Sequence, residues 1–224
     1  KRILALDGRQ HSTYYFIAYI YAAQKKPYQA IAILDSADVR IGRNVYLARL
    51  KRQLLIDTKQ YDLAIETAKR VVAESPYDVE AYVELARTYD LARCDSLARS
   101  TYDLAFKLDS TRLETIIELL DYHVRNNNIN ERFRFEELLL KSEQVPIEAK
   151  IGRIEDITLD QRFYAENFFR IGGLISTLSM HYPTERTIIH LYTNHLCRGG
   201  MFDDAMNYLR RHLDDEGVTV EDFE

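Results

Sequence analysis

The stretch VELARTYDLARCDSLARSTYDLAFKLD (83–109) carries two alanines, Ala86 and Ala98, on faces that otherwise hold larger apolar side chains. Apolar residues recur in it every three or four positions, which predicts two amphipathic helices. Two antiparallel helices whose backbones approach closely need a small side chain at the crossing. The two alanines therefore predict a tightly packed helical hairpin.

The same spacing appears in FIAYIYAAQKKPYQAIAILDSA (16–37), where Ala18 and Ala30 are twelve residues apart, as Ala86 and Ala98 are. Ala30, Ala64 and Ala98 follow one another at intervals of 34 residues. A fixed period of roughly 20 to 50 residues is the signature of a repeat architecture. The alanines therefore predict stacked hairpins that share one crossing geometry.

Larger side chains repeat with the alanines. One period contains Tyr14, Ile17, Tyr21 and Leu34, and a later period has Tyr82, Leu85, Tyr89 and Tyr102 at the matching places. This pattern resembles the tetratricopeptide repeat (TPR), a helix–turn–helix unit. The resemblance implies an all-α fold, a right-handed α-solenoid of about six helix pairs. Because no segment of useful length alternates strictly between apolar and polar residues, we expect no sheet.

The period divides the chain into predicted units. They are the end of a truncated preceding repeat at 1–10, TPRs at 11–44, 45–78 and 79–112, degenerate pairs at 113–145 and 146–185, a TPR at 186–219, and a tail at 220–224. The pair at 146–185 is predicted to have one long second helix, DQRFYAENFFRIGGLISTLSMHY (160–182). Gly199 and Gly200 are expected to form the turn of a hairpin. Lys51 and Arg52 depart from the pattern, which has Leu and a small residue at their positions.

The amino-acid composition limits the classes of partner and ligand that we expect. Thirty basic against 35 acidic residues give a net charge of −5, so nucleic acid is not an expected partner. No run reaches the roughly 18 apolar residues that a membrane span requires. The two cysteines, Cys94 and Cys197, lack the spacing of a metal or redox motif.

Catalytic motifs are missing from the sequence. It contains no GxxxxGK[ST], GxGxxG or HExxH pattern, which would indicate phosphate binding or zinc hydrolysis. His190 and His195 are five residues apart, which places them about 140° apart on a helix, too far around it to share a metal. We therefore expect no cofactor, no metal and no enzymatic activity.

In TPR proteins the first helix of each pair lines the concave surface. Residues one position from the buried stripe are predicted to face it: Tyr15, Tyr19, Arg49, Gln53, Val83, Arg87, Ile117 and Asp121. Tyr and Arg suit protein recognition because they combine a large contact area with a polar group. The alternatives are that Tyr15 and Tyr19 pack against the neighbouring repeat, and that Arg49 and Arg87 only solubilise the surface.

Two functions follow from this prediction. The first is a non-catalytic scaffold that binds a segment of a partner protein in the concave groove. The second is a regulatory or self-associating arm of a longer protein, which stacks through its end repeats on another copy or on an adjoining domain.

The order of regular and degenerate pairs, with LLLKSEQVPIEAKI (138–151) between them and a recovered repeat after HYPTE (181–185), is similar to that of large TPR proteins exported by Bacteroidetes-type bacteria. This resemblance implies a periplasmic or cell-envelope location, with the cytoplasm as the alternative.

Overall fold

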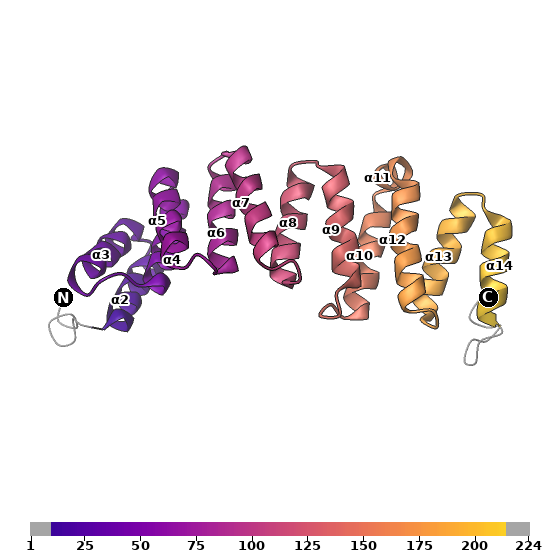
Figure 1. Ribbon diagram of the computed structural model, residues 1–224, viewed down its shortest axis with the longest axis horizontal. Coiled ribbons are helices and arrows are strands. Elements are labelled where there is room, and N and C mark those ends of the chain that lie inside the picture. The colour runs from indigo at the N-terminus through magenta and orange to yellow at the C-terminus, as the bar shows by residue number, and fades with distance from the viewer. Residues whose placement is uncertain (1–9, 214–224) are drawn as a thin grey trace. The chain divides into compact units, whose positions relative to one another are not determined.

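The computed structural model describes residues 10–213, which contain helices and turns and no strand (Figure 1). The helices are α2 (His11–Ala23), α3 (Pro27–Arg40), α4 (Val45–Asp57), α5 (Tyr61–Glu74), α6 (Val79–Leu91), α7 (Asp95–Leu108), α8 (Leu113–Arg125), α9 (Ile129–Lys141), α10 (Ile147–Leu159), α11 (Gln161–Glu166), α12 (Phe168–His181), α13 (Arg186–Arg198) and α14 (Phe202–Leu213). Among these residues, no helix is both long enough and apolar enough to span a bilayer. The expectation of an all-α fold is confirmed.

The chain divides into two compact units, Lys1–Thr115 and Ile116–Glu224. In the first unit, α2 packs on α3, α4 on α5 and α6 on α7, and contacts between α3 and α4 and between α5 and α6 join successive pairs. In the second unit, α12 contacts α9, α10 and α13, and α13 packs on α14. Each unit is therefore a stack of antiparallel helices.

The turns inside the pairs share one backbone geometry. Positive φ angles of 58°, 59°, 62° and 51° occur at Lys25, Lys59, Arg93 and Asn127, which are 34 residues apart. Gly200 (φ 72°) has the same place between α13 and α14, so the predicted glycine turn is confirmed. In the third turn, the Arg93 N–H donates to the Asp90 carbonyl at 3.0 Å. The Cys94 N–H reaches back to the Tyr89 carbonyl at 2.9 Å, which completes a Schellman motif that satisfies carbonyls at the end of the first helix.

The small residues at the crossings are fully buried, as predicted. Ala30, Ala64 and Ala98 have no exposed surface, and each is the fourth residue of its helix. Ala18 and Ala86, each the eighth residue of a first helix, are buried to the same extent. A larger side chain at these five places would push the paired helices apart.

Arg52 is the eighth residue of α4, at the position that Ala18 and Ala86 occupy in the neighbouring pairs. Its side chain is 6% exposed, and its guanidinium donates to Glu84 at 3.0 Å and to Thr88 at 3.2 Å, both on α6. Burial lowers the pKa of Arg52, and the charge of Glu84 opposes that shift. Arg52, which replaces the small residue of the repeat pattern, therefore links α4 to α6, the first helices of two successive pairs.

The prediction of one long helix at 160–182 is wrong, because the chain breaks at Asn167 into α11 and α12. Asn167 has φ −120° and ψ 21°, outside the α-helical region. Its side-chain amide donates to the Phe163 carbonyl at 3.0 Å and so shares that acceptor with its own backbone N–H. Local hydrogen bonding by an Asn side chain competes with the helical ladder in this way.

The second unit encloses charge as well as apolar side chains. Glu136 of α9 has no exposed surface and accepts two hydrogen bonds from Arg153 of α10, at 2.7 and 3.0 Å. The hydrogen bond to Glu136 is the largest cause of the raised pKa of Arg153. Lys150, also buried, donates to the Tyr182 hydroxyl at 2.9 Å. These contacts tie α9 to α10 and α10 to the segment that follows α12.

Candidate functional site

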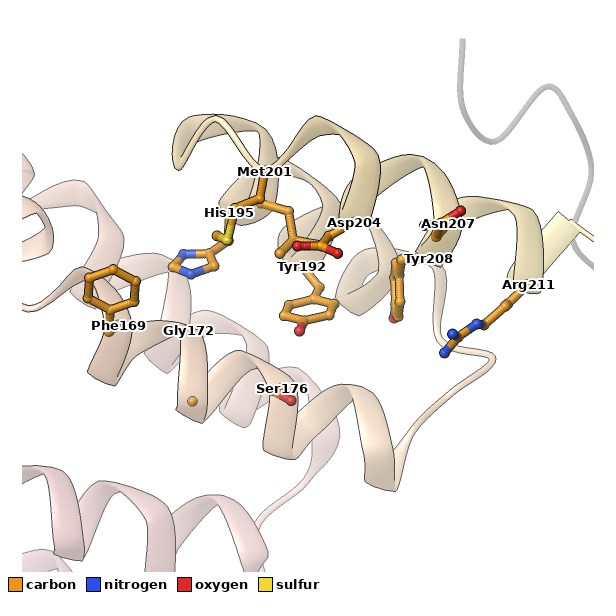
Figure 2. A pocket seen from close by; sticks show the side chains of 12 residues that line it. Phe169, Gly172, Ser176, Tyr192, His195, Met201, Asp204, Asn207, Tyr208 and Arg211 are labelled. Atoms are coloured by element: carbon orange, nitrogen blue, oxygen red, sulfur yellow. The ribbon is translucent and has the colours of Figure 1, made fainter.

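A pocket of about 490 Å³ lies between α12 and α14 and includes part of α13 (Figure 2). All three helices belong to the second unit. The pocket is lined by Phe169, Gly172, Gly173, Ser176, Tyr192, His195, Leu196, Met201, Asp204, Asn207, Tyr208 and Arg211.

Two tyrosines form its inner wall. The rings of Tyr192 on α13 and Tyr208 on α14 meet edge to face, with centroids 4.8 Å apart. The Tyr208 hydroxyl is hydrogen bonded to the Ser179 hydroxyl of α12 at 2.7 Å. Burial raises the pKa of Tyr208, so this hydroxyl stays protonated at neutral pH. Tyr208 is therefore tied to α12 and uncharged, and its ring packs against that of Tyr192.

His195 closes the other end of the pocket. Its ring stacks on Phe168 with centroids 4.1 Å apart, and its Nδ1 is hydrogen bonded to the Tyr164 hydroxyl at 2.8 Å. Burial lowers the pKa of His195, and the nearby charge of Arg198 lowers it further, so the ring is neutral at neutral pH. A Cβ added at Gly172 would lie 2.3 Å from the histidine Nε2, so only glycine allows α12 to approach this ring.

Polar side chains at the rim come from one face of α14. Asp204, Asn207 and Arg211 are exposed and are separated by three and four residues, which places them along the same side of the helix. Figure 2 shows Asp204 and Arg211 with Tyr208 between them. The rim thus offers a carboxylate, an amide and a guanidinium beside the aromatic wall.

This arrangement is suited to binding. Its rings supply apolar contact area, and the rim supplies donors and acceptors, a combination typical of protein-recognition surfaces. Among residues 10–213, no three His, Cys, Asp or Glu side chains are arranged to hold a metal ion. Both titratable groups that face each other at the closed end, His195 and Tyr164, are neutral, because burial also raises the pKa of Tyr164.

None of the eight residues predicted to face a groove lines this pocket. Tyr15 and Tyr19 of α2 are 37% and 58% exposed, and their rings stack with centroids 6.4 Å apart. Tyr15 lines an apolar groove of about 360 Å³ between α2 and α4, together with Phe16 and Tyr46. These two tyrosines are accessible to a partner, and Tyr15 also faces the neighbouring pair.

Arg49 and Gln53 have partners within the first unit. Arg49 forms ion pairs with Asp78 and Glu80 at 3.0 Å and with Glu84 at 3.2 Å. Gln53 donates to Asp57 at 2.9 Å. Arg49 is therefore part of the tie between α4 and α6, and a ligand carboxylate would have to compete with three internal ones.

Val83 departs from the expectation, because it is buried with 8% of its surface exposed. Arg87, on the same helix, is exposed and adds a positive charge near Arg52 that helps to lower the pKa of Arg52. Of these two predicted groove residues of α6, Val83 is therefore inaccessible to a ligand, whereas Arg87 lies at the surface.

Ile117 and Asp121 lie on α8 in the second unit. Ile117 is 39% exposed, and Asp121 is exposed and close enough to Arg153 to contribute to the raised pKa of that guanidinium. Because these two residues and the other six belong to different units, whether all eight share one groove stays a prediction.

Sequence reasoning identified α13 and α14 but missed the pocket beside them. The signal was the pair Gly172–Gly173 in the middle of a predicted helix, where glycine costs about 1 kcal/mol relative to alanine. Such a pair indicates a close approach of another element or an open surface. Gly172 allows the close approach of His195, and Gly173 lies at an open surface.

Similarity to known proteins supports the fold. Over 85% of this chain and 95% of the other, the structure matches YrrB, a TPR protein, at 12% identity with a TM-score of 0.54. It matches a TPR protein from Parabacteroides merdae over 95% of this chain and 82% of the other, at 11% identity with a TM-score of 0.55. Yeast Tom70 matches over 94% of this chain and 44% of its own, at 16% identity with a TM-score of 0.55.

The chain has the TPR fold. A family model described as ChAPs (Chs5p-Arf1p-binding proteins) matches residues 4–97, less than half of this TPR chain. No curated protein matches the chain by sequence. The TPR resemblance drawn from the alanine period is confirmed, and the resemblance to exported Bacteroidetes proteins stays a prediction.

Proposed function

We propose that this TPR chain is a non-catalytic scaffold that holds a segment of a partner protein in the pocket between α12 and α14. The observation that carries the proposal is the lining of that pocket, where Tyr192 and Tyr208 form a fixed aromatic wall beside Asp204, Asn207 and Arg211. Tyr and Arg dominate the energetics of many protein interfaces. Because packing already holds the tyrosines in place, little side-chain entropy is lost when a ligand binds.

The comparisons support an interaction with protein. YrrB is described as having an unusual peptide-binding site, and ChAPs are described as binding Chs5p and Arf1p. We extend only the class of ligand, a protein segment, to this chain.

Neighbouring residues on α14 allow a matched test. Asp204 and Arg211 line the pocket, whereas Asp203 and Arg210, each one residue away and also exposed, do not. The double variants Asp204→Lys/Arg211→Glu and Asp203→Lys/Arg210→Glu change the same charges at the same ends of the helix. Their effects on helix stability through the macrodipole should therefore be alike.

The ligands for this test are twelve-residue peptides selected from a random displayed library against the wild-type chain. We expect the pocket variant to weaken their binding by about tenfold or more, since it reverses the rim charges, and the control to change it by less than about threefold. Equal weakening by both variants would place the site elsewhere. Failure to select any peptide would contradict the scaffold function.

The second candidate is the self-associating arm, which the exposed side of α2 favours. Phe16, Tyr19 and Ile20 are 63%, 58% and 50% exposed and are neighbours on one side of the helix, and contiguous exposed apolar patches mark interaction sites. If α2 pairs with a second copy, light scattering will show a concentration-dependent dimer that Phe16→Glu/Ile20→Glu abolishes. A monomer at every concentration would exclude this candidate.

A further inference from the structure

A second pocket, of about 430 Å³, lies on the other side of α12, between that helix and α9. It is lined by Phe133, Arg134 and Glu137 of α9 and by Arg170, Gly173 and Leu174 of α12, among others. Both pockets belong to the second unit, and Gly173 lines each of them. The two pockets therefore meet over α12 at a residue that has no side chain.

The outer side of α12 is notched at this meeting point. Phe169, Gly173, Ser176 and Met180 follow one another at helical spacing, and the two large residues at the ends are 85% and 71% exposed. A Cβ added at Gly173 would meet nothing within 4 Å. Between Phe169 and Met180, about 16 Å apart along the helix axis, the surface of α12 is therefore low enough for a chain to cross.

The width of the notch favours an extended chain. An α-helix with its side chains is about 10–12 Å across, whereas neighbouring extended strands lie about 5 Å apart. Helical side chains lean toward the N-terminus of their helix, so Met180 leans toward Gly173 and reduces the space between the two ends. An extended segment fits the remaining opening better than a helix does.

Arg170 supplies the second pocket with a positively charged group that a ligand can reach. Its Nη2 donates to the Asn130 Oδ1 at 2.7 Å, and its guanidinium lies 5.6 Å from the centre of the Phe133 ring. Within residues 10–213, no acidic side chain forms an ion pair with Arg170, whereas Arg134 pairs with Glu131 and Glu137 pairs with Lys141. The guanidinium is thus held in place while its remaining N–H groups can receive a carboxylate.

Building on the proposed function, we propose that the bound segment is an extended acidic peptide that crosses α12 at Gly173. It places an Asp or Glu carboxylate against Arg170 and a large aromatic side chain beside Tyr192 and Tyr208. A helix is about 10 Å across and an extended chain advances about 3.3 Å per residue, so the two anchors are three or four positions apart.

The test uses fluorescein-labelled peptides of ten residues in a Ser/Gly background. One set carries Glu and Phe three or four positions apart, and matched peptides replace Glu by Gln or Phe by Ala. Fluorescence anisotropy gives each Kd. We expect each replacement to weaken binding by about tenfold, as loss of an anchor does in peptide recognition.

Two variants test the path and the anchor. Gly173→Leu fills the notch and should weaken the Glu–Phe peptide by about tenfold or more, because the chain can no longer cross. Gly152→Leu is the control, since Gly152 is also a helical glycine whose added Cβ meets nothing within 4 Å, and it lies on α10. Arg170→Gln should make the Glu and Gln peptides bind equally. Circular dichroism should show unchanged helicity in all three variants.

Two outcomes would overturn the inference while leaving the proposed function intact. One is that the Glu–Phe peptide binds the Gly173→Leu variant with the same Kd as it binds the wild type. The other is no binding of Glu–Phe peptides by the wild type while the library-selected peptides still depend on Asp204 and Arg211. If neither kind of peptide binds, both proposals fail.

Discussion

The two units differ at the positions where paired helices cross. In the first unit, the eighth residue of the first helices is Ala18, Arg52 or Ala86, and the fourth residue of the second helices is always alanine. In the second unit the corresponding residues are Leu120, Ile154 and Thr193 on first helices and Arg132, Ile171 and Ala205 on second helices.

Except at Ala205, the second unit has larger groups at these positions, and other residues make room for them. Ile154 and Ile171 are fully buried, Gly172 gives His195 room to stack on Phe168, and the turn residue Asn167 separates α11 from α12. The two pockets described above, which share Gly173 of α12, occur in this unit. The first unit also holds a groove, between α2 and α4, but the two pockets that share Gly173 occur beside α12, where Ile171 replaces the alanine of the crossing.

The largest expected effect concerns Arg52, the charged residue at a crossing position of the first unit. Glu84→Ala should lower the free energy of unfolding by about 3–5 kcal/mol, because it leaves the buried guanidinium of Arg52 without its carboxylate. Urea denaturation followed by circular dichroism measures the change. The control is Glu74→Ala, which removes a pair with Arg43 whose side chain is 61% exposed and should cost less than about 1 kcal/mol. Equal losses would show that the tie between α4 and α6 adds little to stability.

An alanine crossing is tested by Ala98→Leu. The added volume has no space in a fully buried contact, so we expect a loss of about 1–3 kcal/mol in the free energy of unfolding. Ala32→Leu adds the same atoms at an exposed position of α3 and should change stability by less than about 0.5 kcal/mol. If Ala98→Leu is equally harmless, the close crossing is not what defines the regular unit.

Adjacent glycines on α12 test the second unit. Gly172→Ala should destabilise by about 1–2 kcal/mol, since its Cβ would overlap the His195 ring and this outweighs the gain in helix propensity. Gly173→Ala should stabilise by about 0.5–1 kcal/mol, since its Cβ meets nothing. Thermal melts of the two variants should shift in opposite directions, and shifts of the same sign would contradict the described approach of α12 to α13.

The smallest effect concerns the repeated turn. Arg93 has φ 62°, so Arg93→Gly should raise the free energy of unfolding by about 0.5–1 kcal/mol by removing a left-handed non-glycine residue. Arg99→Gly makes the same substitution inside α7, where it should cost about 1 kcal/mol. Chemical denaturation of both variants checks the sign, and a loss in both would mean that the turn geometry carries no strain.

Sequence reasoning predicted most of the fold because the period of the alanines reports a local requirement, a small side chain where the helices of a regular pair cross. It predicted less of the candidate site. The groove prediction applied one orientation to every first helix, whereas Val83 is buried and Arg49 is paired with Asp78, Glu80 and Glu84. Arg49→Glu would therefore break internal ion pairs as well as any contact with a ligand, which makes it a poor test of binding.

The amino-acid sequence by itself determined the helical period, the close crossings at Ala30, Ala64 and Ala98 and the glycine turn at 199–200, because each depends on residues that are near in the chain. Only the tertiary structure decided which side chains face each other between helices. The first pocket takes residues from α12, α13 and α14, and the second takes residues from α9 and α12. Gly173 lines both pockets only because α9 and α14 flank α12. Such long-range neighbours are set by packing, and no spacing along the chain encodes them directly.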